Sequence, residues 1–185
     1  MKKFISFLGS PHKNGNTGTI MKQIIEGIKS QKAEVTEYHL NSLNVKGCQA
    51  CMFCRKNRWC SVKDDIKNVF EDITNSDGIV LGSPIYMYGM TGQTKLLLDR
   101  FYCFLNDDFS HRLGDGKKTI TVFTQGNPNE KAFVPYFNSV KDILKNLGFL
   151  VEHNIVGCGF MGHEKAIENK GLLEGAYKIG VEFAR

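Results

Sequence analysis

Four of the chain's six cysteines lie within one short segment, KGCQACMFCRKNRWC, which spans residues 46–60. They are Cys48, Cys51, Cys54 and Cys60, with the spacing C-x2-C-x2-C-x5-C. Cysteines this close together can form a disulfide knot, a structural zinc site, a redox-active dithiol or an iron–sulfur cluster. Each kind of site implies a different protein around it, so the rest of the sequence must discriminate among them.

The composition indicates a soluble, globular protein with reduced thiols. The 185 residues are 42% hydrophobic and 23% charged, enough for one domain with a full core. The amino-terminal apolar run is shorter than a secretory signal needs, and no stretch approaches the length of a membrane span. We therefore expect a cytoplasmic protein with no membrane partner, which disfavours a disulfide knot. The formal charge of +5 comes without a base-stacking or groove-reading motif, which disfavours nucleic-acid binding.

Short apolar runs alternate with amphipathic segments along the chain. The apolar runs predict five strands, at residues 3–9, 33–40, 77–84, 117–126 and 149–157. The amphipathic segments predict helices at 17–30, 64–75, 91–105, 134–148 and 170–184, the second capped by Asp64 or Asp65. This alternation indicates βαβ units, and therefore an α/β fold with a parallel sheet and helices on both faces.

The loop after the first predicted strand has the composition of an anion site. Ligands of open parallel sheets bind beyond the carboxyl ends of the strands. Here the loop GSPHKNGNTGT, residues 9–19, opens a helix whose free N–H groups favour an anion. Its glycine spacing matches neither a P-loop nor a dinucleotide-binding loop. It suits a monophosphate held by Ser10, Asn16 and Thr17, unless Asn16 or Thr17 only caps the helix.

The loop after the third predicted strand is unusually apolar for the end of a strand. Its residues are Pro84, Ile85, Tyr86, Met87 and Tyr88, and such a cluster requires a partner. A flavin offers a flat ring for this cluster and a phosphate for the first loop. Packing under a neighbouring loop or at a subunit contact is the alternative. The loop after the fourth predicted strand has backbone N–H groups around Gly126 that could face the ring's polar edge.

In this order, GSPHKNGNT, GSPIYMYG, the LLLDRF helix and GCQACMFC resemble the NADPH-dependent FMN reductase family, and more closely its iron–sulfur flavoprotein branch. The resemblance runs from residue 4 to about residue 126, and His12 departs from it, because arginine is common there in the family. It implies a flavodoxin-like, doubly wound, five-stranded parallel sheet of order 2-1-3-4-5 that binds FMN, and a homodimer or homotetramer. We expect a single domain over residues 1–185, with a cysteine-rich cluster loop at 47–61. The expected cofactor-binding residues are Ser10, Lys13, Asn16, Thr17, Pro84, Ile85, Tyr86, Met87, Gly89, Thr124 and Gly126.

The cysteine spacing favours an iron–sulfur cluster over zinc. Zinc ligands usually come in two pairs separated by a dozen or more residues. A C-x2-C-x2-C run instead supplies three corners of a [4Fe–4S] cluster in bacterial ferredoxins, and Cys60 is then the fourth corner. The iron–sulfur flavoproteins share this compact arrangement, while zinc and free or redox-active thiols remain as alternatives. Arg55, Lys56 and Arg58 would offset the cluster's charge, or else form a solvated loop or a docking patch for an acidic carrier such as ferredoxin.

Other reactive side chains are expected to be structural. Cys103 is expected to be buried in a helix, and no role is assigned to Cys158. Trp59 either shields the cluster or packs at a subunit interface. An intrahelical or interface ion pair is expected of Asp99 and Arg100. The histidines have no metal-ligand spacing, and surface or capping roles are expected of His12, His39, His111, His153 and His163.

The sequence thus predicts an FMN-dependent oxidoreductase that passes electrons between a [4Fe–4S] cluster and FMN, with NAD(P)H or ferredoxin as the donor. No catalytic residue is assigned, because the cofactors perform the chemistry and the protein positions them. Two alternatives stay open. One is an NAD(P)H-dependent reductase of flavin, quinones or nitro compounds without a cluster, and the other is a flavodoxin-like electron carrier without turnover.

Overall fold

The computed structural model describes residues 1–162 and 164–185, and its centre is a parallel sheet. The strand order is β2-β1-β3-β5-β6, and neighbours along this path are parallel. The strands are β1 (Lys3–Leu8), β2 (Glu34–His39), β3 (Gly78–Tyr86), β5 (Lys117–Thr124) and β6 (Phe149–Gly157). The predicted flavodoxin-like order is confirmed. The sheet's sixth strand, β4 (Gly89–Met90), was not predicted, because two residues paired in a hairpin with β3 carry no periodic pattern.

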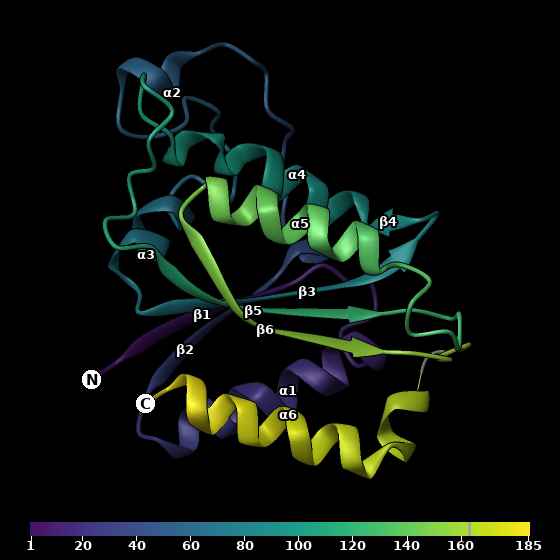
Figure 1. Cartoon of the computed structure of the whole chain (residues 1–185). Coiled ribbons are helices and arrows are strands. Elements are labelled where there is room, and N and C mark those ends of the chain that lie inside the picture. The colour runs from purple at the N-terminus through teal and green to yellow at the C-terminus, as the bar shows by residue number, and fades with distance from the viewer. Residues whose placement is uncertain (163) are drawn as a thin grey trace.

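Helices cover both faces of the sheet (Figure 1). One face carries α1 (Asn16–Ser30) and α6 (Lys170–Phe183), and the other carries α3 (Val69–Asn75), α4 (Gly92–Arg100) and α5 (Val134–Asn146). The shorter helical turns are η1 (Leu40–Ser42), α2 (Phe53–Lys56), η2 (Phe101–Phe104) and η3 (Lys165–Glu168). Over the described parts of the chain, the helices are too short or too polar to cross a bilayer.

Apolar periodicity explains how these elements pack. In α1 the side chains of Ile20, Ile24 and Ile28 recur at helical spacing and are fully buried against the sheet. The central strands β3 and β5 have both faces covered, and their residues are buried almost throughout. The edge strand β2 is partly exposed. Two apolar cores result, one on each face of the sheet.

Helix α3 begins later than the sequence predicts. Its N-cap is Asn68, and the prediction that Asp64 or Asp65 caps it is wrong. Both carboxylates accept hydrogen bonds from more distant backbone. Asp65 Oδ2 accepts from the Asn44 N–H at 2.7 Å, and Asp64 Oδ2 accepts from the Lys46 N–H at 2.9 Å. The carboxylate oxygens that could cap the helix locally are therefore engaged in tertiary hydrogen bonds.

Candidate functional site

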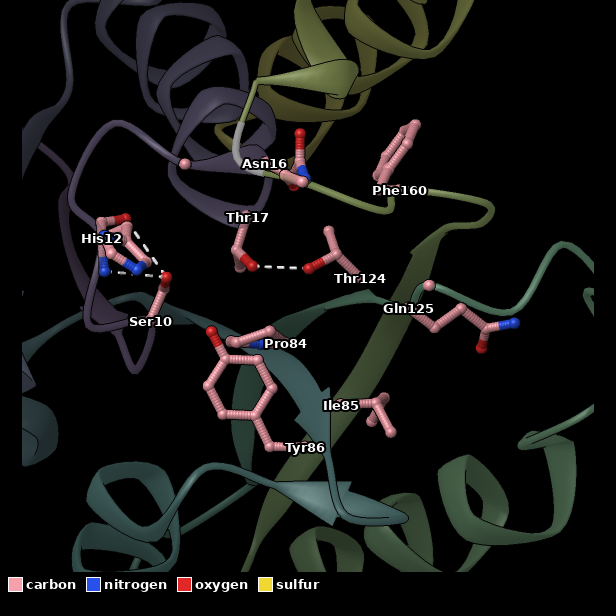
Figure 2. Close-up of a pocket in the computed structure, with 13 residues that line it drawn as sticks. Ser10, His12, Asn16, Thr17, Pro84, Ile85, Tyr86, Thr124, Gln125 and Phe160 are labelled. Atoms are coloured by element: carbon pink, nitrogen blue, oxygen red, sulfur yellow. Dashed lines mark hydrogen bonds between the residues drawn. The ribbon is translucent and has the colours of Figure 1, made fainter.

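A hollow lies at the carboxyl end of the sheet, where loops far apart in the sequence meet (Figure 2). It encloses about 80 Å³, and its walls come from the loop before α1, the ends of β3 and β5, and the loop after β6. The residues that line it are Ser10, His12, Gly15, Asn16, Thr17, Pro84, Ile85, Tyr86, Thr124, Gln125, Gly126, Phe160 and Gly162. The loops that follow β1, β3 and β5 converge because these strands are neighbours in the sheet.

Most of the predicted cofactor-binding residues line this one hollow. They are Ser10, Asn16, Thr17, Pro84, Ile85, Tyr86, Thr124 and Gly126. Lys13 instead lines a separate groove beside α1, while Met87 and Gly89 belong to the hairpin next to the hollow. The sequence did not single out five further lining residues: His12, of which a surface or capping role is expected, Gly15, Gln125, Phe160 and Gly162. The first three adjoin predicted residues along the chain, but no sequence pattern places Phe160 or Gly162 there.

The polar side of the hollow is the amino-terminal end of α1. Its N-cap is Gly15, which has no side chain to satisfy the N–H groups of the first turn. Nearby, the hydroxyls of Thr17 and Thr124 form a hydrogen bond of 2.7 Å, drawn in Figure 2. The Ser10 hydroxyl donates to the His12 carbonyl at 3.1 Å. An open helix N-terminus beside hydroxyl groups favours an anion.

The loop before α1 is held in shape by contacts within the protein. A Cβ at Gly18 would lie 2.0 Å from the carbonyl oxygen of Lys13, so only glycine allows the loop to pack this closely. On its other side, His39 Nε2 lies 2.9 Å from the Ser10 carbonyl oxygen, and His39 Nδ1 lies 2.8 Å from Ser42 Oγ. These contacts fix the shape of the loop beside the hollow.

The side chain of Asn16 is engaged in structural contacts. Its Nδ2 donates to the Gly162 carbonyl at 2.7 Å, and its Oδ1 accepts from the Ala166 N–H at 2.8 Å. These bonds tie the start of α1 to the segment after β6. Phe160 of that segment is held beside the hollow by its own N–H, which donates to the Gln125 carbonyl at 3.0 Å. Asn16 is thus left to contact a ligand through its backbone N–H. His163, in the same loop, lies outside the described residues.

The apolar side of the hollow is the end of β3. Pro84 and Ile85 line it, and Figure 2 shows the ring of Tyr86 beside them. The next two residues, Met87 and Tyr88, form the turn between β3 and β4 with φ of 45° and 68°. Two-residue turns of this kind prefer asparagine and glycine, so bulky residues here cost conformational energy. Such strain is typical of functional loops.

Helix α5 and the segment before it support this turn. The rings of Tyr88 and Phe133 pack edge to face with centroids 6.0 Å apart. The Met90 N–H donates to the hydroxyl of Tyr136 at 2.8 Å. Met87 is left 92% exposed at the tip. The hollow is therefore bordered by an apolar edge that presents unburied side chains to the outside.

The four predicted metal-ligating cysteines lie at the other end of α4 from the hollow. After η1 the chain runs back to α2, which Figure 1 shows beyond the far end of α4. The N-cap of α4, Thr91, donates to the Gly9 carbonyl at 2.7 Å, beside the hollow. The last residue of α4, Arg100, donates to the Lys46 carbonyl at 2.8 Å, near the cysteines. At 1.5 Å per residue, α4 itself is about 13 Å long.

The four thiols share one loop and differ in their exposure. Cys48 and Cys51 are exposed, whereas Cys54 and Cys60 are half-buried. Burial raises the pKa of the Cys54 thiol, and the nearby charges of Cys60, Cys48 and Cys51 raise it further. The pKa of Cys51 is lowered, chiefly by its hydrogen bond with Ser61. In type and number this donor set fits an iron–sulfur cluster. Within the described residues, no group of three metal-ligating side chains is already arranged around one point.

The charged residues at the end of α4 form ion pairs within the chain. Asp99 forms the predicted intrahelical ion pair, with Lys95, but Arg100 crosses to Asp64. The side chains of Arg100 and Asp64 are 2.7 Å apart and completely buried. Cys103 is fully buried, as predicted.

Trp59 packs in the core of its own chain. Its ring lies 6.5 Å from that of Phe70 and 6.1 Å from that of Phe104, centroid to centroid. Both partners are fully buried residues of the core on the α4 side of the sheet. The tryptophan therefore anchors the end of the cysteine loop to that core.

Comparison with known proteins identifies a family and several relatives. Residues 2–132 match the family model described as NADPH-dependent FMN reductase. An iron–sulfur flavoprotein of Methanocaldococcus jannaschii is 32% identical over 98 residues, 53% of this chain and 51% of that protein. An iron–sulfur flavoprotein of Archaeoglobus fulgidus is 28% identical over 186 residues, 98% of this chain and 79% of that protein. The match to the first relative thus spans about half of that relative's length.

Solved structures share the fold at low sequence identity. The NAD(P)H:quinone oxidoreductase from Methanothermobacter marburgensis has a TM-score of 0.76 at 18% identity, covering 100% of this chain and 96% of that chain. A flavodoxin from the domain Archaea has a TM-score of 0.59 at 15% identity, covering 100% and 96% of the two chains. These structures establish the fold, and the family model, which matches most of the sequence, establishes the family. This chain belongs to the NADPH-dependent FMN reductase family, a family of flavin-dependent oxidoreductases.

Proposed function

We propose that the hollow binds FMN, with the phosphate at the amino-terminal end of α1 and the ring against the end of β3. The observation that carries this proposal is the convergence of the three predicted loops on one hollow beside an uncapped helix N-terminus. The enclosed volume of about 80 Å³ suits a few water molecules or a phosphate group, not a whole flavin. The ring must then lie outside it, along the apolar edge formed by Tyr86, Met87 and Tyr88.

In this proposal the chain's residues bind and orient the cofactor. Backbone N–H groups at the start of α1 and the hydroxyls of Ser10 and Thr17 hold the phosphate. Gly18 keeps the loop close enough to α1 for those groups to point at one anion. Tyr86 and the strained turn at Met87 cover the ring. Bound FMN supplies hydride or single-electron transfer, so a protein acid or base is not needed.

We further propose that Cys48, Cys51, Cys54 and Cys60 hold a [4Fe–4S] cluster. Their spacing supplies three ligands from one tight turn and a fourth shortly after it. Several relatives carry the name iron–sulfur flavoprotein, which supports the same assignment. A cluster exchanges single electrons, so it would pair the flavin with a one-electron partner such as ferredoxin. The cationic side chains of Lys56 and Arg58 are exposed beside the cysteines and would suit an acidic carrier.

The donor can be tested by following flavin absorbance in the anaerobic, FMN-loaded protein. Reduced ferredoxin should bleach the flavin within seconds in the wild type and far more slowly in a Cys54→Ser, Cys60→Ser double variant. Equal rates in the two proteins would contradict a role for the cysteines in electron delivery. Failure to bind FMN at all would contradict the first part of the proposal.

A second candidate is an NAD(P)H-dependent reductase of quinones, nitro compounds or free flavin that needs no cluster. It is favoured by the family's NADPH-dependent description. In that case the same double variant should oxidise NAD(P)H with a quinone as fast as the wild type does. A flavodoxin-like carrier would bind FMN and show negligible NAD(P)H oxidation with either protein. The oligomer proposed for all three is a homodimer or homotetramer, which size-exclusion chromatography with light scattering would measure.

A further inference from the structure

The cysteine loop (residues 47–61) has little regular structure to fix its shape. Its helix α2 has four residues, and the carbonyl groups of so short a helix have few partners within it. Just before it, Ala50 and Met52 adopt left-handed backbone conformations, with φ of 49° and 58°. Contacts from elsewhere in the protein must therefore define where Cys54 and Cys60 lie.

Arg112, between η2 and β5, supplies such contacts. Its two terminal nitrogens donate to four carbonyl oxygens at 2.8–3.4 Å, those of Cys54, Arg55, Asn57 and Arg58. These carbonyls belong to α2 and to the turn that follows it. One planar guanidinium therefore spans the chain from Cys54 to a point two residues before Cys60.

Arg112 is itself anchored next to the core. Its backbone N–H donates to the carbonyl of Phe104, and its Nε donates to Asn106 Oδ1 at 3.0 Å. Phe104 is fully buried at the end of η2. The cysteine loop is thus tied to a rigid part of the protein and not to a second loop without support.

A separate anchor closes the base of the loop. Arg100 Nη1 donates to Asp64 Oδ2 at 2.7 Å and to the Lys46 carbonyl at 2.8 Å, while the Lys46 N–H donates to the same carboxylate at 2.9 Å. These bonds join the residue two before Cys48 to the residue four after Cys60. They hold the ends of the loop, whereas the segment between Cys54 and Cys60 is held by Arg112 and by the packing of Trp59 on the core.

We propose that Arg112 is a positioning residue of the cysteine site, which presets Cys54 and Cys60 before metal binds. The inference rests on the proposed role of these cysteines as metal ligands. If Cys54 and Cys60 are already held in place in the folded protein, the loop loses less conformational freedom when the metal binds. A guanidinium suits this role because its donors diverge in one plane, whereas a lysine ammonium cannot serve four carbonyls at once.

Thiol labelling of the full-length chain tests this proposal without relying on activity. The protein is freed of metal with a chelator under anaerobic conditions, and iodoacetamide labelling of each cysteine is followed by peptide mass spectrometry. In Arg112→Gln and Arg112→Lys, Cys54 and Cys60 should be labelled about tenfold faster than in the wild type, because charged hydrogen bonds that restrain the loop are lost. The exposed thiols of Cys48 and Cys51 should change little.

The matched control is Arg58→Gln, which also removes one guanidinium charge, here from the cysteine loop itself. Arg58 is exposed and its guanidinium stacks over the ring of Trp59, 4.9 Å from the centroid. Its loss should leave the labelling of Cys54 and Cys60 within about twofold of the wild type. In every variant the buried Cys103 should stay unlabelled, which verifies that the fold is intact.

Unchanged labelling of Cys54 and Cys60 in both Arg112 variants would overturn the proposal. Protection retained by Arg112→Lys alone would also overturn it, because charge and not the planar donor set would then position the loop. Both results are distinct from a failure of the proposed function. A chain that never takes up iron and sulfide would refute the cluster, while the labelling would still report whether Arg112 orders the loop.

Discussion

The hollow takes its shape from backbone at the ends of β1, β3 and β5, whereas the cysteine loop takes its shape from a few long side chains. In the hollow, parallel strands bring the three loops together, and Gly18 and His39 fix the loop before α1. In the cysteine loop, Arg100 and Arg112 make the contacts that regular structure would otherwise provide. Substitution of one side chain should therefore disturb the cysteine loop more than the hollow.

The largest expected effect is on the buried ion pair at the base of the cysteine loop. Asp64→Ala leaves Arg100 buried without a counterion, and the free energy of unfolding should fall by about 3–5 kcal/mol in urea titrations. The exposed pair of Lys29 and Glu37 offers the control, because Glu37→Gln should cost no more than about 1 kcal/mol. Similar losses in the two variants would contradict the structural importance given to the pair.

The next effect concerns the loop before α1. In Gly18→Ala the new Cβ meets the Lys13 carbonyl, so the loop must move away from α1. The dissociation constant for FMN, measured by quenching of flavin fluorescence, should rise about tenfold or more. Gly92→Ala is the matched control, since a Cβ there meets nothing within 4 Å. If Gly18→Ala bound FMN as tightly as Gly92→Ala, the phosphate would not lie at this helix end.

A smaller effect is expected at the strained turn beside the hollow. Met87→Asn places a residue that tolerates positive φ at the exposed tip, and should raise the free energy of unfolding by up to about 1 kcal/mol. The same variant should bind FMN more weakly, because a side chain at the edge of the ring is lost. Urea unfolding of the FMN-free protein and a fluorescence titration measure the two changes. If Met87→Asn is more stable but binds FMN as tightly as the wild type, the flavin ring does not lie against this turn.

The smallest effect is a dependence of stability on pH near β2, the strand that leads from the sheet toward the cysteine loop. Burial, and to a lesser extent the hydrogen bond to Asp72, together raise the pKa of Tyr38 from 10.0 to about 12. Folding thus favours the neutral phenol. Its contribution is complete below pH 10 and is lost as the pH rises from 10 to about 12. Unfolding measured across this range should show a steeper loss in the wild type than in Tyr38→Phe, and parallel curves would contradict the shift.

Local sequence patterns predicted the hollow well, because its parts are each encoded in one segment. A buried strand followed by a polar or apolar loop is visible in the sequence, and the strand order then brings Thr17, Tyr86 and Thr124 to one place. Phe160 and Gly162 could not be predicted. They reach the hollow because the loop after β6 bonds to Asn16 and to the carbonyl of Gln125, and such long-range contacts leave no periodic signal.

For the cysteine loop, the sequence predicts the candidate ligands but not the residues that hold them. Its cysteines are obvious in the sequence, but their supports are not. The sequence indicates a helix cap for Asp64 and an intrahelical or interface ion pair for Arg100, yet the two residues pair with each other. Arg112 lies in a segment without any recognisable motif. Partners chosen by tertiary packing override the local preferences from which sequence analysis argues.

The most direct test of the two-site account is a cofactor analysis of anaerobically purified wild type and Cys60→Ser. A visible spectrum is combined with measurements of FMN, iron, acid-labile sulfide and zinc. The wild type should hold about one FMN, four iron and four sulfide per chain, and Cys60→Ser should lose iron and sulfide while it keeps FMN. A wild type with flavin and zinc, or with flavin and no metal, would contradict the cluster. Loss of FMN together with iron in Cys60→Ser would contradict the independence of the two sites.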